Sequence, residues 1–227
     1  MFTELRGRDA AAMNEALAKV GFRRSQSVAY RPACEGCSAC ISIRVATRAF
    51  LPSRNMKRIM KANSDLETSA TEAIATDEQY EVLQEYLKTR HADGGMAKMG
   101  AFEYSEMVES SPVSTSLVEY RLKPEAAGAR GLGPLLGVAI TDAMSDGLSM
   151  VYSFFDPAEG RRSLGTFIIL DHIIRAQKAG LPYVYLGYWV AGSPKMDYKR
   201  RFQPLEALGA KGWAPLKPLA GNHTGAG

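Results

Sequence analysis

The chain has 227 residues, of which 46% are hydrophobic, so it can bury one large core or two small ones. Its 28 Lys and Arg residues against 24 Asp and Glu residues give a net charge of +4, which permits a nucleic-acid partner where the cations cluster. The sequence contains no apolar run of about 18 residues and no signal-peptide core. Membrane insertion and secretion therefore have no support, and we expect a cytoplasmic protein.

Two helices and a strand are predicted in the N-terminal part of the chain. Residues 9–20 carry alanine, leucine and methionine at helical spacing and end at Gly21, a residue that tolerates the left-handed stop position. Residues 41–46 are rich in β-branched side chains and predict a strand. A second helix begins at Thr76 with a capping-box pattern and should end near residues 90–91.

A basic helix face is predicted after Pro52. Four cations stand at helical spacing with no acid between them: Arg54, Lys57, Arg58 and Lys61. A solvated helix face is the ordinary interpretation of such a run. Because all four side chains carry one sign, we favour a phosphate partner for this face.

The second half of the chain predicts strands around one crossover helix. Strand-length runs of β-branched and aromatic residues occupy residues 114–122, 135–140, 149–155 and 183–190. Residues 163–179 are apolar around most of a helix and stop at a glycine. A strand, a buried helix and a strand in this order imply a parallel pair. Residues 124–133 predict a surface hairpin loop, and the tail after Trp213 is expected to fray.

Three cysteines, Cys34, Cys37 and Cys40, stand within seven residues. An odd number of cysteines suits neither a secreted disulfide framework nor a complete four-cysteine zinc site. Two interpretations stay open: zinc or iron–sulfur binding through an incomplete ligand set, and small reduced thiols.

An anion-binding turn is predicted between the third of these strands and the crossover helix. The segment 156–166 places Arg161, Arg162 and Ser163 at a helix N-terminus, where unpaired N–H groups and the helix dipole attract a negative group. Ser163 as a plain N-cap with two solvated arginines is the alternative.

The order of strand, anion-holding turn, helix and strand resembles the central unit of GNAT acyltransferases, in which the turn holds a pyrophosphate. This resemblance implies an α+β, GNAT-like acyltransferase fold: a mixed sheet with a crossover helix, built as one or as two GNAT-like lobes. The expected division is an N-terminal lobe at 1–100, a GNAT-like lobe at 101–215 and a flexible tail at 216–227. The turn holds one glycine after the arginines, fewer than acetyl-CoA enzymes carry.

Several separated blocks resemble the aminoacyl-tRNA–protein transferase family, which includes the arginyl-tRNA–protein transferases. The blocks are Tyr30-Arg31-Pro32 with the cysteines, Phe50-Leu51-Pro52-Ser53-Arg54, Arg90-His91, Tyr152-Ser153-Phe154-Phe155-Asp156-Pro157, Ser163-Leu164-Gly165 and residues 186–199. Blocks in one order are more specific than any single block. Family members also carry an upstream Pro-Cys-x-Tyr-Leu segment, which this sequence lacks and whose cysteine would complete a set of four.

The closely spaced cysteines are similar to those of the bacterial, leucine-transferring branch of the family. This resemblance implies transfer of leucine from Leu-tRNA to proteins that begin with Asp or Glu, which marks them for degradation by the N-end rule. The alternatives are arginyl transfer, an acetyl-CoA-dependent N-acetyltransferase and a non-catalytic tRNA-binding adaptor. No cofactor is required for the transfer itself, since the ester bond of a charged tRNA is already activated.

The resemblance and the chemistry of amine attack on an ester suggest roles for individual residues. Asp156 and His91 are the candidates for orienting the acceptor amine and accepting its proton. Cations and one hydroxyl are the candidates for binding the acceptor: Arg90, Lys195, Tyr198 and Lys199. The basic helix face and the residues of the anion turn are the candidates for binding tRNA.

Overall fold

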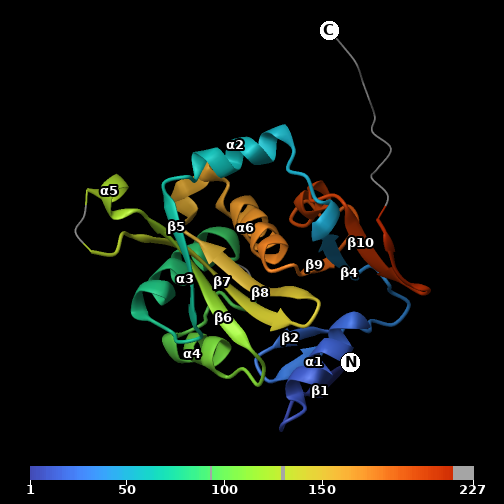
Figure 1. Cartoon of the computed structure of the whole chain (residues 1–227). Helices are drawn as coiled ribbons and strands as arrows, with labels where there is room; N and C mark the ends of the chain where they lie inside the picture. The colour runs from blue at the N-terminus through green and yellow to red at the C-terminus, as the bar shows by residue number, and fades with distance from the viewer. Residues whose placement is uncertain (93, 129–130, 217–227) are drawn as a thin grey trace.

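An eight-stranded mixed sheet forms the centre of the protein (Figure 1). The computed structural model describes residues 1–92, 94–128 and 131–216. The strand order is β11-β10-β4-β9-β8-β7-β6-β5. The strands are β4 (Ile41–Ala46), β5 (Leu66–Glu72), β6 (Thr115–Leu122), β7 (Leu135–Met144), β8 (Gly147–Phe155), β9 (Tyr183–Trp189), β10 (Leu205–Gly209) and β11 (Gly212–Pro215).

The strands β8 and β9 form a parallel pair inside this otherwise antiparallel sheet. The helix α6 (Leu164–Lys178) connects them, as a parallel connection requires. Their pairing covers only Gly147–Ser149 against Tyr183–Tyr185, although both strands continue beyond it. The two strand edges that face each other past this point therefore have no ladder between them.

Helices cover both faces of the sheet. On one face, α6 and the helix α2 (Arg54–Ala62) pack over the larger core. On the other, α3 (Asp77–Arg90) and α4 (Ala101–Glu109) enclose a second core. Neighbouring residues of one strand serve opposite cores, as Leu117 and Val118 of β6 do, because successive side chains alternate across a strand.

The N-terminal segment forms a small unit beside the main sheet. It contains β1 (Phe2–Glu4), α1 (Ala10–Lys19), β2 (Arg23–Ser25) and β3 (Val28–Tyr30), with strand order β1-β3-β2. Arg24 joins this unit to β7 through two hydrogen bonds of 2.6 Å to the carboxylate of Asp142. Both side chains are almost fully buried, so the pair fixes where the N-terminal unit sits.

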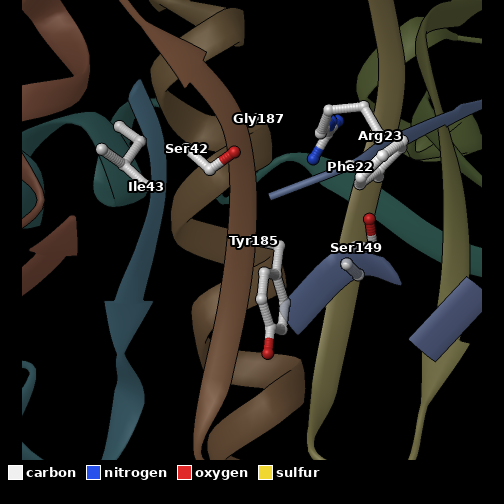
Figure 2. A pocket seen from close by; sticks show the side chains of 8 residues that line it. Phe22, Arg23, Ser42, Ile43, Ser149, Tyr185 and Gly187 are labelled. Carbon is white, nitrogen blue, oxygen red and sulfur yellow. The ribbon is translucent and has the colours of Figure 1, made fainter. Parts of the chain in front are cut away.

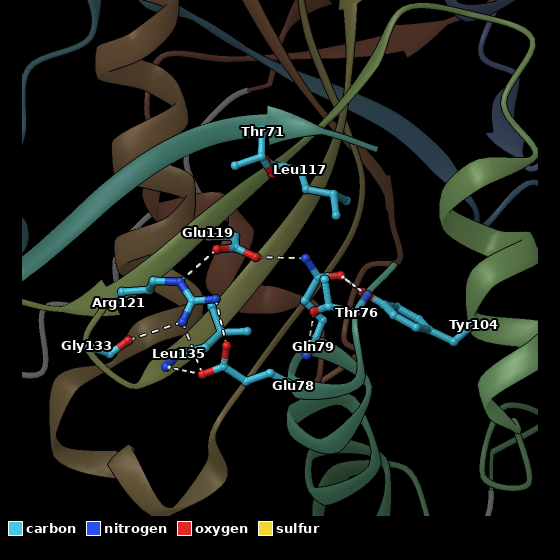
Figure 3. Close-up of polar contacts among 10 residues, drawn as sticks. All are labelled: Thr71, Thr76, Glu78, Gln79, Tyr104, Leu117, Glu119, Arg121, Gly133 and Leu135. Carbon is cyan, nitrogen blue, oxygen red and sulfur yellow. Dashed lines mark hydrogen bonds and ion pairs between the residues drawn. The ribbon is translucent and has the colours of Figure 1, made fainter. Parts of the chain in front are cut away.

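A polar network holds α3 against the sheet (Figure 3). The guanidinium of Arg121 donates to Glu78 of the helix at 2.8 Å and to Glu119 of the strand at 2.8 Å. The Gln79 amide donates to the other oxygen of Glu119 at 2.7 Å, and the Tyr104 hydroxyl donates to Gln79 at 2.9 Å. These bonds set the position of α3, whose last turn reaches the site described below.

Most of the elements expected from the sequence are present. The α1, β4, α2, α3, α6 and β9 elements lie where predicted, and the capping box at Thr76 is confirmed. The short strands β1, β2, β3 and β10, the edge strand β5 and the helix α4 were not predicted. The expectation of a frayed chain after Trp213 is wrong for its first residues, because β11 pairs with β10. The rest of the tail, 217–227, lies outside the described residues.

The predicted loop 124–133 is partly wrong, since α5 (Pro124–Ala127) is a helical turn; residues 129–130 lie outside the described part. Three further short helical turns are η1 (Thr47–Ala49), η2 (Pro157–Arg162) and η3 (Asp197–Arg201). Among the described residues, no helix has the length and apolar character that a membrane crossing requires.

Candidate functional site

The unpaired stretch between β8 and β9 contains two cationic side chains. Arg23 of β2 donates to the carbonyl oxygen of Met150 on β8. Lys199 of η3 donates to the carbonyls of Leu186 and Tyr188 on β9, at 2.8 and 2.9 Å. Side chains thus replace the missing ladder and satisfy strand carbonyls that would otherwise be left without partners.

Next to this stretch, three segments distant in sequence bring an aromatic and cationic cluster together. The Tyr86 ring of α3 lies 5.5 Å from the His91 ring and 5.0 Å from the Phe155 ring at the end of β8. Tyr198 of η3 and Lys195 of the loop before it reach the same place: Tyr198 lies near enough to Tyr86 for the two hydroxyls to interact, and Lys195 lies near enough to His91 to repel its charged form. The end of α3, the end of β8 and η3 therefore form one site.

His91 is held in the form that can accept a proton. Its pKa lies below the ordinary value of 6.5, first because burial disfavours the imidazolium and then because Lys195 and Arg90 repel it. The Arg90 guanidinium itself lies 6.0 Å from the centre of the Phe155 ring. At neutral pH the His91 ring is mostly uncharged, so it has a free lone pair.

Asp156 follows Phe155 directly and is the N-cap residue of η2. Its Oδ1 accepts a hydrogen bond of 2.8 Å from the Ala158 backbone N–H. The Asp156 backbone N–H donates to Leu136 at 2.9 Å, which fixes the residue at the end of the sheet. Asp156 is half-buried and is the direct neighbour in sequence of Phe155, whose ring packs in the cluster.

The turn for which anion binding was predicted lies directly before α6, and its two arginines differ in their surroundings. Arg162 donates to both oxygens of Asp65, at 2.7 and 2.9 Å, and to Glu159 at 2.7 Å. Arg161 is exposed. Ser163 occupies the N-cap position of α6 with a left-handed backbone, φ +54°, and its side chain forms no capping bond. The charge of Arg162 is thus balanced within the protein, whereas Arg161 faces solvent.

The basic face lies on α2 as predicted. Arg54, Lys57, Arg58 and Lys61 are all exposed, while Met56 and Ile59 on the opposite side of the helix are buried. Ser53 caps the helix by accepting from the Met56 N–H. Asn63, just after α2, donates to the Arg162 carbonyl at 2.9 Å, so this helix ends beside the anion turn.

The three cysteines lie on an exposed loop rather than in a closed site. Cys34, Cys37 and Cys40 are free and exposed, and they line an open hollow of about 480 Å³ together with Arg31 and residues 208–210. Within the described ranges, no three His, Cys, Asp or Glu side chains are gathered as metal ligands would be. The residues present do not fit a complete four-ligand site, and no step below depends on a metal.

The structure gathers four of the expected candidates around Tyr86, namely His91, Arg90, Lys195 and Tyr198. It places Lys199 in the β8–β9 gap together with Arg23, which was not predicted, and Asp156 directly after Phe155. Arg23 could be noticed in the sequence only as one of two adjacent arginines, since nothing local indicates which of them is paired. Arg24 is the one that binds Asp142. The strand alternation that sends Arg24 to β7 sends Arg23 to the β8–β9 gap.

The fold defines the class as an α+β protein with a mixed sheet, and comparison with solved structures agrees. The chain is similar to the crystal structure of FemX, with a TM-score of 0.51 and 12% identity over 85% of this chain and 63% of that chain. At this identity the likeness shows the fold alone.

Sequence comparison identifies the family. The arginine-tRNA-protein transferase N-terminal profile matches residues 1–58 and the C-terminal profile matches residues 78–209. The aspartate/glutamate leucyltransferase of Sphingopyxis alaskensis is 54% identical over 219 residues, covering 96% of this chain and 84% of the relative. That of Bradyrhizobium sp. strain ORS 278 is 54% identical over 97% of this chain and 86% of its own length. The chain belongs to the arginine-tRNA-protein transferase family.

Proposed function

We propose that this protein, in a GNAT-like acyltransferase fold, transfers leucine from Leu-tRNA to the N-terminal amine of proteins that begin with Asp or Glu. The observation that carries the proposal is the 54% identity, over 96% of the chain, to a relative named as an aspartate/glutamate leucyltransferase. The arrangement of neutral His91 among cations supports the same reaction.

The reaction is an aminolysis. The uncharged α-amine of the acceptor attacks the carbonyl carbon of the leucyl ester, a C–N bond forms, and the bond to the ribose oxygen breaks. His91 accepts the proton that the amine loses, and the ribose oxygen takes up a proton as it leaves. Because the ester is already activated, orientation of the two reactants supplies a large part of the rate.

The residues around His91 suit an acceptor with a negative side chain and a positive amine. Asp156 can orient the ammonium group before it loses its proton. Arg90, Lys195 and Lys199 supply positive charge for the acceptor's carboxylate, and Tyr198 supplies a hydroxyl. A lysine at the acceptor's N-terminus would meet these cations and be repelled.

The tRNA is expected to lie across α2 toward the anion turn. The exposed cations of α2 and Arg161 can neutralise phosphates without reading bases. Because α2 ends beside the turn, this path would bring the acceptor end of the tRNA to the start of α6, near Asp156.

Arginine is the second candidate donor, because the matching family profiles are named for arginyl transfer. The composition of the cluster supports leucine: Tyr86 packs against the rings of His91 and Phe155, and the charges that act on His91 are positive. A guanidinium on the donor would be repelled by Arg90 and Lys195.

The test is transfer of radiolabelled amino acid from charged tRNA to peptides that differ only in their first residue. Leucine should be incorporated into Asp- and Glu-peptides and not into a Lys-peptide, and arginine should be a poor donor. His91→Gln should remove most of the incorporation, with tRNA binding unchanged. Label transferred from acetyl-CoA, or tRNA binding with no transfer by the wild type, would overturn the proposal.

A further inference from the structure

Arg23 reaches the β8–β9 gap from a different unit of the protein. Figure 2 shows its side chain between the two strands, beside Gly187 of β9 and Ser149 of β8. Gly187 has a left-handed backbone, φ +79°, and a Cβ there would lie 3.0 Å from the Arg23 guanidinium carbon. The strand therefore bends close to Arg23 in a way that only glycine accommodates without strain.

Lys199 places a second cation in the same gap. Its ammonium group is anchored by two backbone carbonyls of β9, and no third acceptor for it is found among the described residues, so one N–H can bind another group. Burial, followed by repulsion from Arg23, lowers the pKa of Lys199 to about 8. The two cations are thus close enough for one to disfavour the charge of the other.

No carboxylate in the described part of the chain forms an ion pair with Arg23 or Lys199. Asp142 is the carboxylate whose charge acts on Arg23, but its two oxygens already accept hydrogen bonds from Arg24 and Thr115. The Tyr188 hydroxyl also interacts with Arg23, and burial raises its pKa to about 12, so it supplies no negative charge at neutral pH. Two like charges held together in a poorly solvated place cost free energy, which an entering anion would offset.

We propose that Arg23 and Lys199 together bind the side-chain carboxylate of the acceptor's N-terminal Asp or Glu, which makes Arg23 a specificity-determining residue contributed by the N-terminal unit. This inference rests on the proposed function. A small cavity of about 10 Å³ lies beside Arg23, lined on the two strands by Ser149 and Gly187, and it has room for one water-sized group such as a single carboxylate oxygen. The guanidinium fork also matches a planar carboxylate.

The test compares kcat/KM for Asp-, Glu- and Asn-peptides at saturating Leu-tRNA. Arg23→Gln, whose amide can still donate to the Met150 carbonyl, should lower the preference for Asp over Asn about tenfold to a hundredfold, mainly by raising KM for the acidic peptides. Its affinity for Leu-tRNA should not change. Lys195→Gln is the comparison arm, because Lys195 belongs to the cluster around His91 and lies outside the gap. Lys178→Gln, at an exposed cation in the last turn of α6, is the control.

Each outcome decides the inference. Equal loss of activity on all three peptides would make Arg23 a purely structural residue, and loss of selectivity only in Lys195→Gln would place the carboxylate in the outer cluster; either result overturns the inference. Should Arg23→Gln fail to fold, Arg23→Lys, which keeps the charge but loses the fork, must still reduce the Asp-over-Asn preference. Absence of leucyl transfer by the wild type would instead refute the proposed function.

Discussion

Arg162 and Asp65 form a pair of parallel hydrogen bonds, Nη1 to Oδ1 at 2.7 Å and Nη2 to Oδ2 at 2.9 Å. The pair connects the segment after α2 to the turn before α6. Arg162 lowers the pKa of Asp65, as an attached guanidinium must. The second charge of the Arg-Arg dipeptide thus holds the anion turn in place, while the first is presented to solvent.

Replacing Arg162 should affect stability, and replacing Arg161 should affect tRNA binding. Arg162→Ala should lower the free energy of unfolding by about 1–2 kcal/mol, a value reduced by partial solvent screening of the pair. Arg161→Ala should leave stability within about 0.5 kcal/mol and weaken tRNA binding. Urea unfolding and filter binding measure the two effects; a reversed pattern would show that the two arginines have exchanged roles.

The basic face of α2 should determine the salt dependence of tRNA binding. The double variant Arg54→Ala with Arg58→Ala should lower the slope of log affinity against log salt by about one to two units, because each phosphate contact releases counterions. The control is Lys178→Ala, an exposed cation at the far end of α6. An unchanged slope in the double variant would mean that this face is only solvated.

The pKa of His91 should depend on the charges around it. Lys195→Ala should raise the pKa of His91 toward 6.5, because one of the repelling cations is removed. Proton NMR titration of the His91 ring measures this pKa directly. It needs no acceptor peptide, whose α-amine would titrate in an overlapping pH range. Lys88→Ala, on α3 but paired with Glu85, is the control. A lower His91 pKa in Lys195→Ala would contradict the geometry of the cluster.

The sequence was informative wherever a local pattern determines the structure. The one-sided cations after Pro52 and the capping box at Thr76 describe single helices, and both lie where predicted. The order of strand, helix and strand predicted the parallel pair β8–β9 for the same reason. In each case the pattern and the structure it specifies lie within one stretch of chain.

The sequence did not predict contacts between residues that are distant along the chain. Which of Arg161 and Arg162 is free depends on Asp65, about a hundred positions earlier. The position of Arg23 depends on where the β8–β9 ladder ends, and no spacing in the sequence encodes that. The edge strand β5 was missed because it is polar and largely exposed, so the apolar alternation that indicates a strand is absent.

The cysteine loop should behave as three accessible thiols. Because Cys34, Cys37 and Cys40 are free and exposed, Ellman's reagent should titrate all three without denaturant. Metal analysis of the same sample provides the comparison with the zinc or iron–sulfur interpretation. Fewer than three reactive thiols, restored to three by a chelator, would show that the loop does bind a metal.

His172 should make the protein less stable in mild acid. Its ring is completely buried between α6 and the sheet, where Nδ1–H donates to the Ile168 carbonyl at 2.8 Å and Nε2 lies 2.8 Å from the Thr141 hydroxyl. Burial lowers the pKa of His172 below 6.5, an effect that outweighs the attraction of Asp171. The unfolded chain therefore takes up a proton near pH 6.5 while the folded protein does so only at lower pH.

Above pH 6.5, His172 should therefore add no pH dependence to the free energy of unfolding. Between pH 6.5 and the pKa of His172 in the folded protein, the free energy of unfolding should fall by up to about 1.4 kcal/mol per pH unit. The comparison is made in a His91→Gln background, because the pKa of His91 is also lowered and would add a pH dependence of the same sign. Adding His172→Gln should remove this part of the pH dependence and lower stability at pH 7.5 by about 1–3 kcal/mol, since the bonds of the imidazole are lost. Urea titrations at pH 7.5, 6.5 and 5.5 give both quantities. An acid slope that persists unchanged in the His172→Gln variant would assign the effect to other titrating groups.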